Sequence, residues 1–230
     1  MSNSFEQEQS APEITSIAML AEGMVLRLPG ATDIEIRKAL QEAYVDFCRL
    51  SSCFTFRREI ELEKDERDYP VPTHVPGAYV DSITEVRIGG RKLVAPFDYE
   101  IEVGSTPIIR VAERHIIDFI TERDRASRPE FHAISRKPRM MIVTAIDIPK
   151  PGSERAPRWF YAKYGEAVVA GALVKLFGMT GKPWSDGVQA QHELVRWENA
   201  LTEARVRSVY APDGGSGSGA ISALDTSGLL

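Results

Sequence analysis

The spacing of apolar residues changes twice along this chain, and these changes constrain its fold more than any single motif does. Thr32 and Glu35 have the spacing of a capping box, in which each side chain bonds a backbone amide of the other residue. Apolar residues then recur every three or four positions, at Ile36, Ala39, Leu40, Ala43, Tyr44 and Phe47. This period predicts a helix over residues 32–50 with one buried face.

The apolar spacing falls to two over the next hundred residues. Alternate positions from 54 to 62 are mostly apolar and predict one strand face: Phe54, Phe56, Arg58, Ile60 and Leu62. Gly89 and Gly90 predict a two-residue hairpin turn after a strand with Thr84, Val86 and Ile88 on one face. Further strands are expected over 108–111, 116–120 and 140–148, and the last, apolar on both faces, should be central. Hairpins without intervening helices indicate an antiparallel sheet or a small barrel.

The longer apolar spacing returns in the last third of the chain. Residues 158–177 are apolar almost all round, which is typical of a core helix or of a subunit-interface helix. Residues 185–209 predict a second helix with a narrow seam for one partner helix, formed by Ala190, Leu194, Trp197, Leu201 and Ala204.

These patterns predict an α+β protein with three parts. Residues 1–30 are expected to be a flexible N-terminal segment. Residues 31–210 should form the body, in which one N-terminal and two C-terminal helices make a small helical bundle beside a central antiparallel β domain over 54–148. Residues 211–230 begin with a Gly/Ser-rich stretch, native or engineered, and should form an extended C-terminal arm.

Composition excludes several classes of protein. The chain is 43% apolar and 27% charged with a net charge of −5, which is ordinary for a globular protein and argues against one that grips DNA over its whole surface. Cys48 and Cys53 fit neither a disulfide framework nor a zinc motif, so we expect reduced thiols. No apolar run approaches the length of a membrane-spanning helix.

The motifs that resemble catalytic signatures are incomplete. His192 and Glu193 begin like a zinc-protease helix, but the second histidine position holds Arg196. Gly181 and Lys182 resemble the end of a phosphate loop, but Pro183 follows where Ser or Thr is needed. We therefore expect no catalytic, metal or cofactor site, with hydrolase kept as a minor option.

Two segments stand out as candidate contact sites. The most basic stretch lies within residues 123–139. Its candidate contact residues, for a neighbouring subunit or another partner, are Arg125, Arg128, Arg136, Lys137 and Arg139. It is either a solvated loop or a loop that touches an acidic partner surface or a DNA backbone. The arm ends in four large aliphatic residues that either dock on another protein or are incidental: Ile221, Leu224, Leu229 and Leu230.

The order of these features resembles the head-to-tail adaptor family of tailed bacteriophages, also called connector or head completion proteins. The resemblance covers roughly residues 30–210 and rests on layout. The features that carry the resemblance are, in chain order, the early helix from Ile34, the extended Tyr69-Pro70-Val71-Pro72, the hairpin from Ile83 to Leu93, the apolar run that starts at Tyr164, and the segment Gly181-Lys182-Pro183-Trp184.

The resemblance implies a structural virion protein with no enzymatic activity or cofactor. Family members form a dodecameric ring between the portal and the tail nozzle or tail tube, in the neck of the virion, and double-stranded DNA passes through without specific binding. The C-terminal arm would embrace the portal. Two alternatives stay open: a virion-associated cell-wall hydrolase, and a DNA-binding module that uses the basic 123–139 loop.

Overall fold

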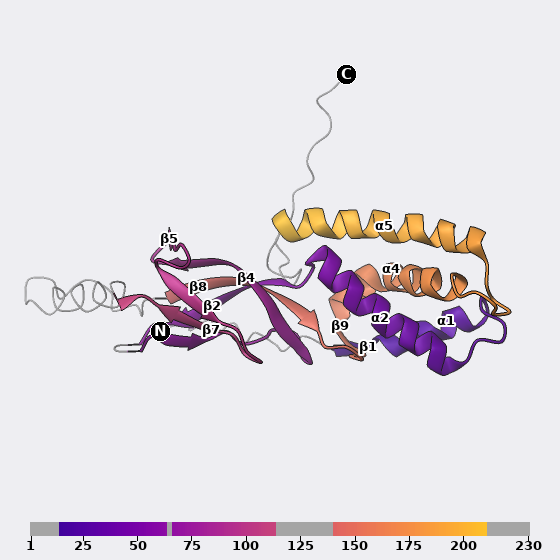
Figure 1. The fold of residues 1–230 in the computed structure, drawn as a ribbon, viewed down its shortest axis with the longest axis horizontal. Helices are drawn as coiled ribbons and strands as arrows, with labels where there is room; N and C mark the ends of the chain where they lie inside the picture. Colours follow the sequence, from indigo (N-terminus) through magenta and orange to yellow (C-terminus); the bar gives the residue numbers. More distant parts are fainter. Residues whose placement is uncertain (1–13, 64–65, 114–139, 211–230) are drawn as a thin grey trace, which may run out of the picture.

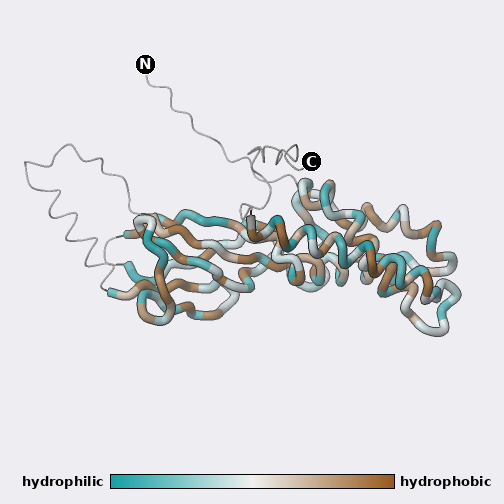
Figure 2. The backbone as a smooth tube through the Cα atoms, turned by 90° about the horizontal axis from the view of Figure 1, so that it is seen from above, coloured by the Kyte–Doolittle hydropathy of each residue, from teal (hydrophilic) through white to brown (hydrophobic). Residues whose placement is uncertain are grey.

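The computed structural model describes residues 14–63, 66–113 and 140–210. It is a mixed α+β structure with antiparallel sheets, as the sequence predicts. The described chain is elongated, with strands at one end of its long axis and helices at the other (Figure 1). Figure 2 shows the same extended body from above.

The N-terminal segment belongs to the body from residue 14 onward. Strand β1 (Ile14–Ser16) pairs antiparallel with β9 (Arg155–Pro157), and is followed by the 3-10 helix η1 (Ile17–Ala21) and the short helix α1 (Glu22–Val25). Ile17, Ala21, Met24 and Leu28 are all buried in the core. The predicted flexible segment over 1–30 is therefore wrong for its second half, because these apolar side chains fill the space between the longer helices.

Helix α2 (Asp33–Ser51) confirms the predicted capping box. The Thr32 Oγ1 accepts from the Glu35 amide at 3.3 Å, and a Glu35 carboxylate oxygen accepts from the Thr32 amide at 3.0 Å. The other oxygen of Glu35 accepts from Lys182 Nζ at 2.9 Å. The Thr32 amide, together with Lys182 and the Thr32 hydroxyl, lowers the pKa of Glu35 from its usual 4.5 to about 2.

This lowered pKa predicts an acid-dependent contribution to stability. A carboxylate with a depressed folded-state pKa stabilises the protein above its unfolded-state pKa and loses that effect as pH falls through the folded-state pKa. We expect the melting temperature of the wild type to fall more steeply between pH 4.5 and 2 than that of Glu35→Gln. Thermal melts across this range measure the difference, and parallel curves for the two proteins would contradict it.

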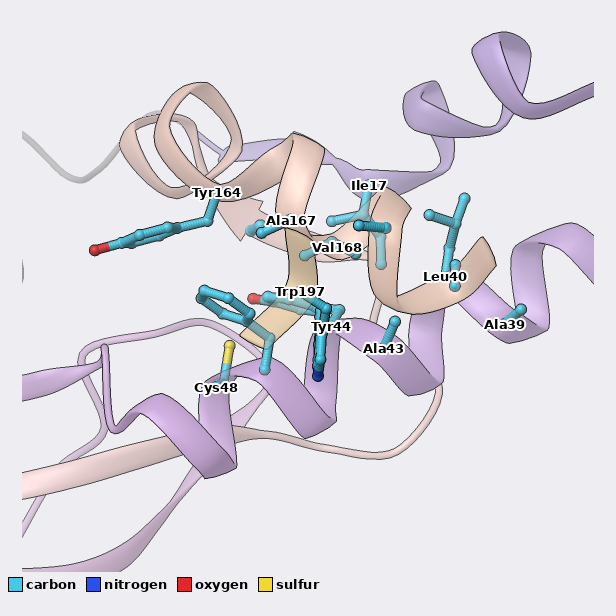
Figure 3. Close-up of a cluster of buried hydrophobic side chains, with 14 of the residues drawn as sticks. Ile17, Ala39, Leu40, Ala43, Tyr44, Cys48, Tyr164, Ala167, Val168 and Trp197 are labelled. Carbon is cyan, nitrogen blue, oxygen red and sulfur yellow. The ribbon is translucent and has the colours of Figure 1, made fainter. Parts of the chain in front are cut away.

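Helices α4 (Arg158–Phe177) and α5 (Gly187–Tyr210) pack with α2 around one core. Figure 3 shows Tyr44, Val168 and Trp197 close together there, with the ring of Tyr164 extending to one side. Of the two readings of the apolar helix 158–177, the structure shows the core helix, because α2, α5, η1 and β9 cover it within one chain. The predicted α5 seam is also confirmed: three of its five residues are buried and the other two are partly buried.

The main sheet has the strand order β2 (Thr55–Glu61), β8 (Met140–Pro149), β4 (Ala78–Ile88) and β5 (Arg91–Lys92), all antiparallel. The central position predicted for β8 is confirmed. The two-residue turn is confirmed as well, with positive φ at Gly89 and Gly90. The sequence predicts Thr84, Val86 and Ile88 on one face; Val86 and Ile88 are both buried, but Thr84 is exposed because the register between β4 and β8 shifts there.

A second sheet has the order β3 (Asp68–Pro70), β7 (Ile108–Val111) and β6 (Tyr99–Glu102), also antiparallel. The apolar spacing predicts β7 but gives no signal for β6, whose side chains after Tyr99 are exposed. The strand predicted over 116–120 lies outside the described residues.

The two sheets share a core of their own, which includes Val86, Ile109 and Val143. We call residues 55–111 and 140–149 the β unit, and residues 17–51 and 158–210 the helical unit. The core of the helical unit extends to Phe54, Phe56 and Ala78 at the start of the sheet, so it also joins the two units.

Candidate interaction surfaces

The predicted contact residues lie outside the part of the chain that the structure describes. This applies to the arm residues Ile221, Leu224, Leu229 and Leu230, and to the basic residues Arg125, Arg128, Arg136, Lys137 and Arg139. The described residues do, however, show where each of the two segments is attached.

The arm is attached at the junction between the two units. Arg205 Nε, near the end of α5, donates to the backbone oxygen of Leu50 at 2.7 Å. Leu50 lies in the last turn of α2, which ends just before β2 begins. An arm that follows Tyr210 therefore starts midway along the molecule (Figure 1).

The basic segment is attached at the far end of the β unit. It follows β7 and precedes β8, whose first residue, Met140, is paired with Glu61. Two exposed apolar residues lie nearby: Val94 and Phe97 are 55% and 73% exposed in the loop that leads into β6. Because Tyr99 at the start of β6 pairs with Val111 at the end of β7, this loop lies close to the attachment of the basic segment.

A buried ion pair joins Arg58 of β2 to Asp147 of β8. The side chains are 2% and 0% exposed, and Arg58 Nη2 donates to Asp147 Oδ1. The remaining donors of Arg58 bond backbone oxygens of Pro72 (2.6 Å), Ala145 (3.3 Å) and Phe56 (3.4 Å). The guanidinium is thus enclosed by partners on several sides, as a buried charge requires.

The second oxygen of Asp147 fixes the loop before β4. It accepts from the amides of His74 at 2.7 Å and Val75 at 3.4 Å. Burial raises the pKa of Asp147, although the Arg58 guanidinium and these amides favour the carboxylate. Burial lowers the pKa of Arg58 in turn, while Asp147 opposes that shift. The group ties a loop to two strands and presents no open carboxylate for acid–base chemistry.

His74 is part of the same structural group. Its ring stacks on Phe56 with a centroid separation of 5.0 Å and an interplanar angle of 14°. Burial, and then the nearby Arg58, lower the pKa of His74. The ring therefore serves as a neutral packing element rather than a cationic group.

The incomplete catalytic motifs are occupied by structural contacts. Glu193 is buried and pairs with Arg27 and with Arg196 Nη1 at 3.1 Å. Although burial favours the neutral acid, these ion pairs keep the pKa of Glu193 below its usual value. His192 is 69% exposed beside it. The Arg27–Glu193 pair holds the N-terminal segment against α5.

Lys182 likewise has a structural role. It lies in the loop after α4, pairs with Glu35 and lies 5.2 Å from the centre of the Trp184 ring. Within 14–63, 66–113 and 140–210, no three His, Cys, Asp or Glu side chains form a group that could hold a metal ion. None of the helices in these ranges is long and apolar enough to cross a bilayer.

Sequence reasoning misses the partners of the buried charges. Arg58 stands out as a charged residue at an inward position of an alternating strand, which is the available signal that a buried partner exists. Asp147 lies 89 positions further along the chain, and local patterns do not connect the two residues.

No protein-family model matches the chain, and no curated protein matches it.

Proposed function

We propose that this chain is a structural virion protein that forms a ring-shaped adaptor between the portal and the tail of a tailed bacteriophage. The observation that carries the proposal is the elongated body, in which a helical unit and a β unit lie along one axis (Figure 1). The two candidate contact segments are attached at different points of this body, one at the junction and one at the end of the β unit. Such a layout suits a protein that binds different neighbours at different places.

Each part has an expected role in this function. The helices form a small bundle that serves as a rigid spacer, and the C-terminal arm docks on the portal through Ile221, Leu224, Leu229 and Leu230. The basic residues of 123–139 contact a neighbouring subunit or a tail nozzle or tail-tube protein. The ring is a dodecamer in the neck of the virion, assembled in the host cytoplasm, with no enzymatic role and no membrane contact.

The net charge of −5 is compatible with a DNA channel. Double-stranded DNA binds proteins that offer an excess of Lys and Arg. An adaptor with an acidic balance lets DNA pass without specific binding.

The arm assignment is tested by a variant with Leu224→Asp and Leu230→Asp. Charged groups at apolar anchors lose the contact with the portal, because a carboxylate buried in an apolar groove has no partner. We expect at least a tenfold loss of binding to purified portal rings in a co-sedimentation assay, with the melting temperature unchanged. Val103→Asp is the matched control, since Val103 is 89% exposed on the β unit. Portal binding equal to that of the wild type would contradict the arm assignment.

A further inference from the structure

Helix α5 has a second regular face, opposite to the seam that packs on α4. The positions at this face are Val188, His192, Val195, Asn199, Thr202, Val206 and Val209. All seven are exposed, with Val188 at 80% and Val209 at 74%. None of them is Asp, Glu, Lys or Arg, and the six such residues of α5 all lie elsewhere on the helix. We call these seven positions the outer stripe.

The spacing of the outer stripe is that of a coiled coil. Its positions alternate in steps of four and three, which is the period at which one helix packs against another. The inner seam follows the same rule and packs on α4, whereas no described element covers the outer stripe. Figure 1 shows α5 at the outer edge of the helical unit.

The charges beside the outer stripe select the partner and its direction. One flank carries Arg196 and Glu203, and the other carries Glu198 and Arg205. Each flank thus has one base and one acid seven positions apart, in opposite order. We consider an antiparallel pair of α5 helices related by a two-fold axis between residues 200 and 201. In this pair Arg196 lies beside Glu203 of the second copy, and Glu198 lies beside Arg205 of the second copy.

The same register aligns the stripe itself. It places Val195 opposite Val206 of the second copy, and Asn199 opposite Thr202 of the second copy. A parallel pair would place Glu198 opposite Glu203 of the second copy at both flanks, which is repulsive. The surface is therefore complementary to itself in one orientation only.

The contacts that these charges already make are compatible with this pairing. Arg196 Nη2 is 3.4 Å from Glu166, and Glu203 pairs with Arg207 at 2.8 Å, all at the surface. Arg205 uses its Nε on Leu50. Exposed ion pairs contribute little energy, so their role in a dimer is to set direction.

The size of the surface predicts a weak dimer. In this register residues 191–210 of the two helices overlap over about 30 Å, and with a width of about 10 Å the pair would bury roughly 600 Å² in total. This is below the range of stable complexes and fits a reversible contact. The Asn199–Thr202 layers favour one register at a cost in affinity.

We propose that two copies of this chain bind each other through the outer stripe of α5, antiparallel and with two-fold symmetry. A two-fold contact is isologous and cannot join neighbours around a closed cyclic ring. The dimer is therefore a state of the free chain, which separates before the ring assembles.

Sedimentation equilibrium of the full chain tests the dimer. We expect reversible dimerisation with a dissociation constant on the order of micromolar, and a monomer for the variant with Val195→Glu and Val206→Glu. Val103→Glu on the β unit is the control and should leave the dimer intact. A wild type that stays monomeric up to about 1 mM, or a double variant that still dimerises, would overturn the proposal.

Charge reversal tests the direction. Glu198→Arg should weaken the dimer at least tenfold, because the arginine at position 198 then lies beside Arg205 of the second copy twice, both times on the flank that carries these two positions. Adding Arg205→Glu to this variant restores opposite charges and should recover most of the affinity. Failure of the double reversal to recover affinity would exclude the antiparallel register.

Engineered cysteines test the contact itself. In a variant with Val195→Cys and Val206→Cys the two thiols lie about 16 Å apart along one helix, too far for an internal disulfide. The native Cys48 and Cys53 are buried. We expect oxidation to give a cross-linked dimer and nothing larger, because both cysteines of each copy are used within one dimer. A ladder of higher oligomers would show a head-to-tail contact and overturn the proposal.

A measurement of portal binding tests the proposed adaptor function independently of the proposed dimer. The variant with Val195→Glu and Val206→Glu should keep its affinity for portal rings, since the dimer separates before assembly. A wild type that dimerises but does not bind portal rings would contradict the adaptor function while leaving the dimer intact.

Discussion

Replacing Asp147 by Ala is expected to lower the free energy of unfolding by about 3–5 kcal/mol. The change leaves the Arg58 guanidinium buried without a counter-charge, and leaves the amides of His74 and Val75 without their acceptor. Breaking a buried pair from one side is far more damaging than removing both partners. Since small domains have only about 5–15 kcal/mol of stability in total, urea denaturation should show a large shift in midpoint.

Two further variants distinguish this effect from a general sensitivity to lost charges. Asp68→Ala removes one partner of the Asp68–Arg110 pair, whose side chains are nearly half exposed, and should leave the urea midpoint almost unchanged, because exposed ion pairs contribute little to stability. The double variant Arg58→Met with Asp147→Leu should recover much of the loss, because it removes both charges together. Equal losses for Asp147→Ala and Asp68→Ala would contradict the structural role of the buried pair.

Gly171→Ala is expected to destabilise the helical unit by about 1–3 kcal/mol. A Cβ at this position of α4 would overlap the six-membered ring of Trp197 on α5. The ring has little room to move, because it is buried and lies 5.3 Å from the centre of the Phe47 ring. The side chain of alanine therefore forces the two helices apart along the seam, which a thermal melt would detect.

A double-mutant cycle assigns the effect to this contact. In the background of Trp197→Leu, Gly171→Ala should be much less damaging, because a smaller side chain leaves space for the methyl group. Gly187→Ala is the matched control, since a Cβ there meets nothing within 4 Å. Additive effects of Gly171→Ala and Trp197→Leu would show that the two positions do not compete for the same space.

Features set by local chemistry are predicted well from this sequence. The capping box at Thr32 and Glu35 specifies the start of α2, and the Gly89-Gly90 pair specifies a two-residue hairpin turn. The bounds of α4 follow from its continuous apolar run. In each case neighbouring residues determine the backbone conformation, so the pattern alone is informative.

Features set by distant partners are not predictable in this way. Residues 14–28 form only very short elements, so their sequence resembles that of a flexible segment. Their structure depends on packing against α2 and α4. The same holds for Arg58 and Asp147, which meet only once β2 and β8 are paired. The aliphatic arm and the basic 123–139 stretch lie outside the described residues, so their contacts stay predictions.

Electron microscopy of the purified chain mixed with portal rings measures the proposed function itself. We predict a dodecameric ring of this chain, coaxial with the portal, with a continuous central channel and with C-terminal arms that follow the portal surface. Deleting residues 211–230 should leave the portal rings bare. Portal rings that stay bare with the full chain at saturating concentration, or copies bound without ring symmetry, would contradict the adaptor function.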